Sequence, residues 1–133
     1  MEIKLVEDSD EELASFLTAK ISEFNWERWE VSERLPLAAK LEDEAGSVIA
    51  GAAGRTFGDW LLLDTLWVDK SLRGQGTGDK LLDIMEQAAI KRGCTKCLLD
   101  TLNFQARPFY EARGYELQWT QEGYPKTGCK YFM

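Results

Sequence analysis

Glycines stand at every second position in one short stretch of this 133-residue chain, at Gly74, Gly76 and Gly78, directly after Arg73. The stretch separates an apolar run, residues 60–68, from a segment whose apolar residues follow helical spacing, residues 76–92. A glycine-rich turn between a strand and a helix can direct several backbone N–H groups at one point, where the helix N-terminus adds partial positive charge. The pattern therefore predicts a pyrophosphate site, with Arg73 as a cation at its entrance.

The residue types at each position of this turn distinguish between kinds of phosphate site. A dinucleotide-binding fingerprint needs a glycine where Asp79 stands, and a P-loop needs Gly-Lys-Ser/Thr where Asp79 and Leu81 stand. The pattern Arg-x-x-Gly-x-Gly, formed by Arg73, Gly76 and Gly78, instead resembles the acetyl-CoA signature of the GCN5-related N-acetyltransferase (GNAT) family. For this motif alone, a tight strand-to-helix connection without a ligand is the structural alternative.

A second motif lies downstream, in residues 103–115. It resembles the family pattern Asn-x-x-Ala-x-x-Phe-Tyr-x-x-x-Gly-(Phe/Tyr), and the matching positions are Asn103, Ala106, Phe109, Tyr110 and Gly114. Two independent motifs in the family's order, on the expected elements, are hard to obtain by chance. The chain is therefore identified as a member of the GNAT family, with a resemblance that runs from about the first expected strand to the last.

The resemblance implies a fold and a co-substrate. One α/β (α+β) domain is expected over residues 1–133, with helices on both faces of a single mixed, mostly antiparallel sheet. In this fold a central pair of parallel strands splays apart, and acetyl-CoA lies in the gap. No metal ion is expected.

The cofactor contacts of the family carry over to matching positions. Backbone groups of the strand before the glycine turn would meet the pantetheine arm, and the turn itself would wrap the pyrophosphate. Asn103 would hydrogen-bond the cofactor near the start of the following helix. The expected cofactor-binding residues are Leu66, Trp67, Val68, Arg73, Gly74, Gln75, Gly76, Thr77, Gly78 and Asn103.

The implied reaction is direct attack of a primary amine on the acetyl carbonyl, without a covalent enzyme intermediate. Tyr110 would act as general acid and protonate the departing thiolate; its structural alternative is an aromatic side chain packed beside Phe109. An ammonium group with a pKa of about 10 must first lose a proton, which a carboxylate can accept through water. The alternative from another functional class is a non-catalytic module that binds or senses acyl-CoA.

The general base is less well marked. Some relatives carry a catalytic glutamate on the strand before the glycine turn, where this chain has Leu62. Strand alternation places Leu62, Asp64, Leu66 and Val68 on one face, which makes Asp64 the candidate for base or amine anchor. Asp100, at the end of the neighbouring strand, is the competitor. For either carboxylate, acceptance of hydrogen bonds from backbone donors at the splay is the structural alternative.

Aromatic and acidic residues gather after the first expected helix, on the side where the resemblance places the acceptor. Such a cluster suits a cationic amine, although tryptophans that cover the sheet and glutamates that face water are the favoured interpretation. The loop at residues 123–128 also lies near the acceptor side in this family. The cluster comprises Glu23, Trp26, Glu27, Trp29, Glu30 and Glu33.

Composition narrows the partners. A net charge of −7 disfavours nucleic acid and anionic membranes, and favours polyamines, aminoglycoside-like molecules or lysine side chains over anionic acceptors. The chain has no histidine, which excludes Ser-His-Asp and Cys-His triads and most zinc sites. The chain has three cysteines, too few for a disulfide scaffold, and no export signal, so a cytoplasmic protein is expected. Cys94 and Cys97 are expected to lie in the core as free thiols. Since relatives are often dimers, a homodimer is one option.

Periodicity and turn residues predict the elements that must position these groups. A Ser9/Glu12 capping box opens the first helix, whose apolar stripe holds Leu13, Phe16 and Ile21. Gly93 is expected to end the second helix. Strands are expected at residues 2–7, 36–44, 47–56, 60–68, 95–101, 114–120 and 127–132, and the other helices at 76–92 and 105–113.

Overall fold

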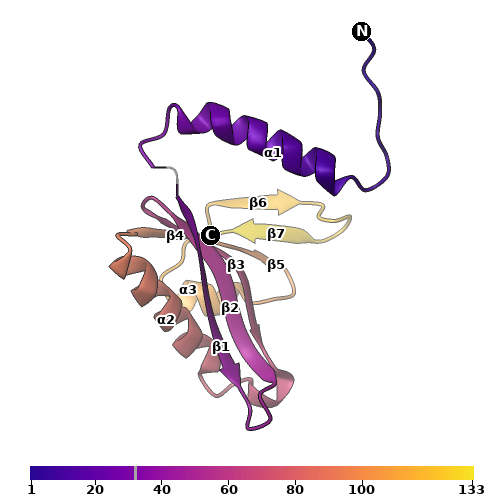
Figure 1. Cartoon of the computed structure of the whole chain (residues 1–133). Coiled ribbons are helices and arrows are strands. Elements are labelled where there is room, and N and C mark those ends of the chain that lie inside the picture. The colour runs from indigo at the N-terminus through magenta and orange to yellow at the C-terminus, as the bar shows by residue number, and fades with distance from the viewer. Residues whose placement is uncertain (32) are drawn as a thin grey trace. The chain divides into compact units, whose positions relative to one another are not determined.

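The computed structural model describes residues 1–31 and 33–133. The chain divides into two compact units, the first ending at residue 32 and the second running Glu33–Met133 (Figure 1). All strands found in the described residues belong to the second unit, which also holds both motifs.

The first unit contains one helix, α1 (Glu11–Trp26). Its N-cap is Asp10, whose Oδ1 accepts a hydrogen bond from the Leu13 N–H at 2.8 Å, so the cap expected at Ser9 is displaced by one residue. The strand expected at residues 2–7 is wrong. Ile3 and Leu5 alternate as a strand would, but this segment pairs with no strand in the described residues and both side chains are exposed.

The second unit begins with an antiparallel meander. Strands β1 (Arg34–Glu42), β2 (Val48–Phe57) and β3 (Trp60–Val68) pair in that order, and β4 (Lys96–Leu98) adds to β3 in parallel. A second sheet has the order β5 (Asp100–Leu102), β7 (Cys129–Phe132), β6 (Trp119–Glu122), with antiparallel pairs. The mixed architecture with one parallel pair confirms the predicted fold class.

The strand expected at residues 95–101 belongs to both sheets. It pairs with β3 as far as Leu98 and with β7 from Leu99 onwards, so one expected strand becomes β4 and β5. The expected single sheet is thereby divided by its hydrogen bonding at the splay. The strand expected at residues 114–120 begins later in the structure. Trp119 is the first residue that pairs with β7, and it starts strand β6.

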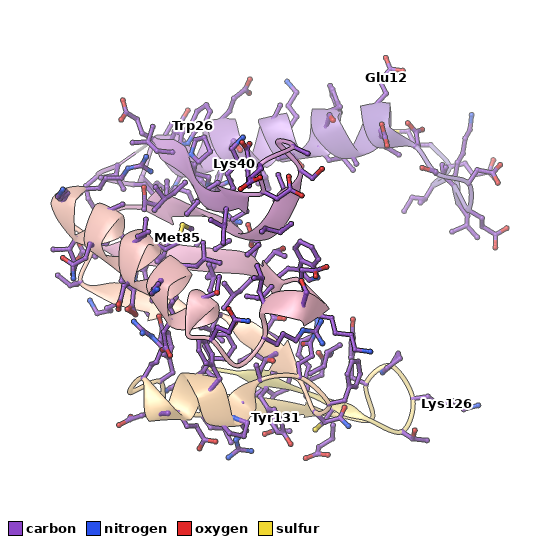
Figure 2. The ribbon with its side chains drawn as sticks, turned by 90° about the horizontal axis from the view of Figure 1, so that it is seen from below. Glu12, Trp26, Lys40, Met85, Lys126 and Tyr131 are labelled. Carbon is purple, nitrogen blue, oxygen red and sulfur yellow. The ribbon has the colours of Figure 1, made fainter. Side chains whose placement is uncertain are left out.

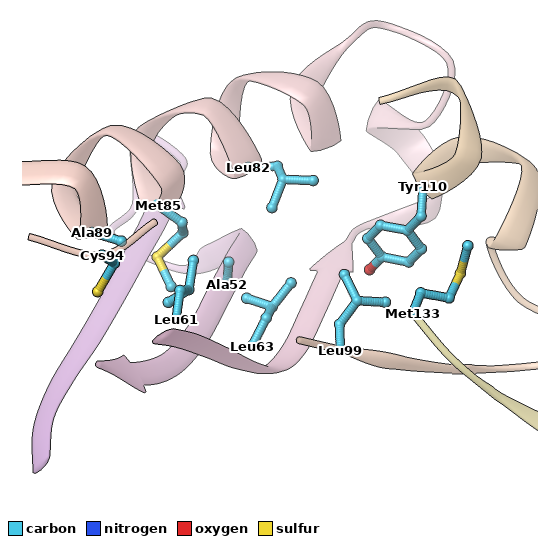
Figure 3. Packing of buried hydrophobic residues seen from close by; sticks show 10 residues of the cluster. All are labelled: Ala52, Leu61, Leu63, Leu82, Met85, Ala89, Cys94, Leu99, Tyr110 and Met133. Carbon is cyan, nitrogen blue, oxygen red and sulfur yellow. The ribbon is translucent and has the colours of Figure 1, made fainter. Parts of the chain in front are cut away.

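Helices α2 (Thr77–Lys91) and α3 (Arg107–Ala112) contribute to one core with the strands (Figure 3). The largest fully buried side chains are Leu61 of β3 and Leu82 and Met85 of α2. Gly93 follows the end of α2 with φ +92°, as its predicted role requires. A short 3₁₀ helix, η1 (Lys70–Leu72), leads from β3 toward α2. The glycine turn thus lies between β3 and α2, both of which are anchored in the core.

A β-bulge interrupts β3 at Asp64. Ala53 of β2 pairs with Thr65, whereas the next residue, Gly54, pairs with Leu63, so Asp64 has no counterpart. Glycine permits this close approach, since a Cβ on Gly54 would collide with the carbonyl oxygen of residue 62. The extra residue bends the strand and increases its twist just before the glycine turn.

The bulge reverses which side chains of β3 face the core. Leu61 and Leu63 are buried before it, and Leu66 packs against the core after it. One extra residue turns every later side chain to the opposite side of the sheet. The prediction that Leu62, Asp64, Leu66 and Val68 share one face of the strand is therefore wrong. Leu62, before the bulge, lies on the opposite side from Leu66 and Val68, after it.

None of the described helices combines the length and the apolar character that crossing a bilayer requires.

Candidate active site

A cavity opens where β3 and β5 diverge. The parallel ladder between β3 and β4 ends at the pair Leu62 and Leu98. Leu99 then exchanges two backbone hydrogen bonds with Met133, at 3.0 and 2.9 Å, and no longer pairs with β3. The space between residues 63–68 and 99–102 forms a cavity of about 770 Å³, here called the acceptor cavity; it includes the gap in which the resemblance places acetyl-CoA, so donor and acceptor would meet in it.

A second cavity, of about 470 Å³, lies over the glycine turn and is here called the cofactor cavity. The glycine turn, the end of β3 and the start of α3 all contribute to its lining. The two cavities adjoin, because five residues line both: Leu66, Val68, Arg73, Ala106 and Tyr110.

The N-terminus of α2 presents uncapped backbone donors to the cofactor cavity. Gly76 is the N-cap residue, with the left-handed angles φ +80° and ψ 11°, and no side chain caps the helix. Within the part of the chain that the structure describes, the N–H groups of residues 76–79 have no hydrogen-bond acceptor. Such a terminus, with its partial positive charge, is suited to binding a phosphate group.

The charged side chains before the turn hold its backbone. Asp69 accepts hydrogen bonds from the backbone N–H and the hydroxyl of Ser71, at 3.0 and 2.5 Å, and these bonds lower the pKa of Asp69 below its usual value. The Arg73 Nε donates to the Val68 carbonyl at 3.1 Å. The guanidinium is thereby tied to the end of β3 at the border of both cavities.

A carboxylate in the first turn of α2 is neutralised from α3. Asp79 lines the cofactor cavity, where a free negative charge would repel a phosphate. Arg113, whose side chain is only 16% exposed, donates to Asp79 Oδ1 at 2.9 Å. The same guanidinium reaches Asp83 at 2.7 Å and Glu86 at 2.6 Å, so it also joins α2 to the end of α3.

Tyr110 reaches the junction of the two cavities from within the core. The residue is 6% exposed, and its ring packs edge-on against Phe109 and Tyr115, with ring centroids 5.1 and 5.7 Å away. The hydroxyl points toward Leu63 and Leu99, the first residues after the strands separate (Figure 3). Burial raises the pKa of Tyr110 above its usual value, and Cys97 and Asp100 add to the effect. The phenol is therefore protonated at neutral pH.

Two carboxylates line the acceptor cavity in different electrostatic states. Asp64, at the bulge, accepts from Arg55 Nη1 through both oxygens, at 3.1 and 3.0 Å. Asp100, at the start of β5, has no ion pair with any described residue. Both are exposed enough to meet water or an amine.

Most of the predicted cofactor residues line the two cavities, but two do not. Leu66, Trp67, Val68, Arg73, Gly74, Gly76, Thr77 and Gly78 all contribute. Gln75 is absent from both linings, and its side chain reaches the Ser71 carbonyl at 3.4 Å. Asn103 is absent too, because its Oδ1 accepts from the Cys129 N–H at 3.2 Å and thus holds β7. Cofactor binding by all ten residues stays a prediction.

Sequence reasoning missed part of the acceptor cavity. Lys130 of β7 and Tyr124 of the preceding loop line its wall, although only the loop's general location was expected. No spacing could have shown Lys130, because it enters the site through the pairing of β7 with β5. The cluster from Glu23 to Glu30 belongs to the first unit and is not placed relative to this cavity.

The profile of the Acetyltransferase (GNAT) family matches residues 4–115 of the chain. The chain belongs to this family. It is 32% identical over 115 residues to Acetyltransferase Atu2258 of Agrobacterium fabrum, a match that covers 86% of this chain and 84% of that protein. It is 37% identical over 83 residues to Blasticidin-S acetyltransferase of Streptomyces morookaense, covering 62% and 61%. This GNAT protein is an acyl-CoA-dependent acetyltransferase.

Solved structures agree with the fold. An acetyltransferase from Bacillus cereus superposes with a TM-score of 0.85 at 29% identity, covering 97% of this chain and 94% of that one. A Bacillus anthracis protein described as a streptothricin acetyltransferase, in complex with acetyl coenzyme A, has a TM-score of 0.65 at 16% identity, covering 77% and 62%. The second likeness concerns the fold alone.

Proposed function

We propose that residues 1–133 form one N-acetyltransferase domain, which moves an acetyl group from acetyl-CoA to the primary amine of a small molecule or peptide. The observation that carries the proposal is the buried Tyr110, which lines both the acceptor and the cofactor cavity. The cofactor would place its diphosphate at the N–H groups of residues 76–79 and its thioester beside Tyr110. A structure of this fold in complex with acetyl coenzyme A supports that choice of donor.

In this mechanism the amine nitrogen forms the new bond to the acetyl carbon and the carbon–sulfur bond breaks. A carboxylate of the acceptor cavity takes one proton from the incoming ammonium, and solvent takes the second after attack. Tyr110 gives its proton to the departing sulfur and regains one from solvent. A backbone N–H at the exposed edge of β3 polarises the carbonyl oxygen. The net reaction releases one proton and one free thiol.

The acceptor is proposed to be a cationic amine, in keeping with a net charge of −7 and with small molecules such as the one named for the blasticidin-S relative. Free Cys94, Cys97 and Cys129 fit a reducing compartment, so a cytoplasmic location is proposed. Assembly as a homodimer is proposed as well.

A thiol-release assay with acetyl-CoA tests the function. Amines from four classes serve as acceptors: polyamines, aminoglycosides, amino acids and lysine peptides. Release above the rate of spontaneous thioester hydrolysis, with formation of the N-acetyl product by mass spectrometry, is expected for at least one class. Binding of acetyl-CoA without release in any class would instead indicate a cofactor-sensing module.

Substitution of the two acidic residues assigns the base. We propose Asp64 as base or amine anchor and expect Asp64→Asn to lower kcat/KM by about 10²-fold, the lower end of the range for general base catalysis. The pH–rate profiles of the variants and of the wild-type enzyme are recorded alongside, since loss of a general base alters the profile. Asp100→Asn is the matched variant in the same cavity. If Asp64→Asn leaves rate and profile unchanged while Asp100→Asn alters both, the base is Asp100.

A further inference from the structure

The wall of the acceptor cavity carries a positively charged side chain, Lys130, which a site for purely cationic amines would not need. Lys130 of β7 is half-buried in its wall and pairs directly with Leu102 of β5. Directly paired residues lie on the same face of a sheet, as do residues two apart in one strand. Lys130 and Asp100 therefore share one face as diagonal neighbours, about 7–8 Å apart.

The Lys130 ammonium is positioned but not neutralised. Its Nζ lies 4.2 Å from the centroid of the Tyr124 ring and 6.0 Å from that of Phe132. These ring faces attract the cation and fix it at the cavity wall. Among the described residues no carboxylate lies within 4.0 Å of Lys130.

The charges of the cavity thus differ in how they are compensated. Asp64 is paired with Arg55, and Arg73 is bound to the Val68 carbonyl beside the cofactor cavity. Asp100 and Lys130 have no counterion among the described residues, so the acceptor wall presents one negative and one positive group several ångströms apart. A charge without a counterion, above all the half-buried one of Lys130, is stabilised when a ligand of opposite charge arrives.

We propose that the acceptor is a zwitterionic amine, whose carboxylate binds Lys130 and whose ammonium group is anchored at Asp100, which leaves Asp64 the role of base and not that of anchor. The proposal rests on the proposed function and narrows its acceptor class. An amino acid or a molecule with an amino-acid-like end fits the pair, since its two charges bridge the diagonal between β5 and β7. A polyamine lacks the anion for Lys130 and would place further positive charge beside it.

Acceptors matched in all but the carboxylate test the proposal. Each pair consists of an amino acid and the amine obtained by removing its carboxylate, such as phenylalanine and phenethylamine. We expect the wild-type enzyme to favour the amino acid of its best pair by at least about tenfold in kcat/KM, the scale of one charge-assisted hydrogen bond. A preference for the decarboxylated amine in every pair would overturn the proposal.

Lys130→Gln is expected to remove this preference. It should lower kcat/KM for the amino acid by at least about tenfold, change that for the amine by less than about twofold, and leave the KM for acetyl-CoA unchanged. Lys130→Arg, which keeps the charge, should retain most of the preference. The control is Lys126→Gln, because Lys126 carries the same charge in the neighbouring loop, extends into solvent and lines neither cavity (Figure 2).

The outcomes separate the two proposals. If Lys130→Gln lowered kcat/KM equally for both acceptors, or raised the KM for acetyl-CoA, Lys130 would not bind the carboxylate of the acceptor, and the proposal would be overturned. Turnover without any dependence on the carboxylate would overturn the zwitterion alone. No thiol release by the wild-type enzyme with any acceptor would overturn the proposed function, and the zwitterionic acceptor with it.

Discussion

Tyr110→Phe is expected to lower kcat by about 10²–10³-fold, within the range for loss of a general acid, while the dissociation constant for acetyl-CoA changes by less than about twofold. The substitution removes only the oxygen that faces Leu63 and Leu99 and keeps the ring that packs against Phe109. Single-turnover kinetics, with product quantified by mass spectrometry, separate the chemical step from product release.

Tyr115→Phe is the matched control. Tyr115 packs edge-on against Tyr110 but donates its hydroxyl hydrogen to Glu86 at 2.8 Å, outside both the acceptor and the cofactor cavity. We expect this variant to lose some stability and to keep kcat within about threefold, since one buried hydrogen bond contributes to folding rather than to chemistry. Equal kcat for wild type and Tyr110→Phe would refute the role of the phenol.

The pH dependence of the wild-type enzyme follows from the same side chain. Because burial raises the pKa of Tyr110 above its usual value of about 10, the acid form persists through mildly alkaline solution. Loss of rate through ionisation of Tyr110 should therefore begin only above that value. The stability linked to this group is fully present below pH 10 and is lost as pH rises through the raised pKa, since the unfolded chain releases the proton first.

Gly76→Ala is expected to weaken acetyl-CoA binding by about 10–100-fold, the result of losing one or two well-aligned N–H contacts to phosphate. Gly76 adopts φ +80°, which alanine adopts only with a strain of about 1–2 kcal/mol. A Cβ there has no protein atom within 4 Å and would project into open space beside the turn. Isothermal titration calorimetry with acetyl-CoA measures the change.

Gly46→Ala supplies a control with the same backbone strain. Gly46, in the turn between β1 and β2, has φ +85° and equally open surroundings. Thermal unfolding should show a similar loss of stability for both variants, whereas only Gly76→Ala should lose affinity for acetyl-CoA. Parallel losses of affinity would mean that the effect at Gly76 is one of stability rather than of contact.

The sequence predicts the cofactor side of the site far better than the acceptor side. Arg73, Gly76 and Gly78 are neighbours in the chain, so their local spacing already determines a turn of this shape. Tyr110 is likewise placed by a motif on one helix. Local patterns of this kind depend on a few consecutive dihedral angles and need no knowledge of the sheet.

The acceptor side depends on pairings between distant segments. The bulge at Asp64 arises because Gly54 of another strand admits a close approach, and period-two alternation in β3 gives no sign of it. Lys130 and Asp100 become diagonal neighbours only through the register of β7 against β5. The division of residues 96–102 between two sheets likewise depends on Met133, at the far end of the chain.

Titration of the wild-type protein with acetyl-CoA, in parallel with S-acetylpantetheine, tests most directly whether backbone amides at the start of α2 bind a diphosphate in a protein of net charge −7. The two ligands share the thioester and differ in the diphosphate and nucleotide. We expect saturable binding of one acetyl-CoA per chain and at least about tenfold weaker binding of S-acetylpantetheine, equivalent to about 1.4 kcal/mol. No detectable binding of acetyl-CoA, or equal affinity for both ligands, would contradict this expectation.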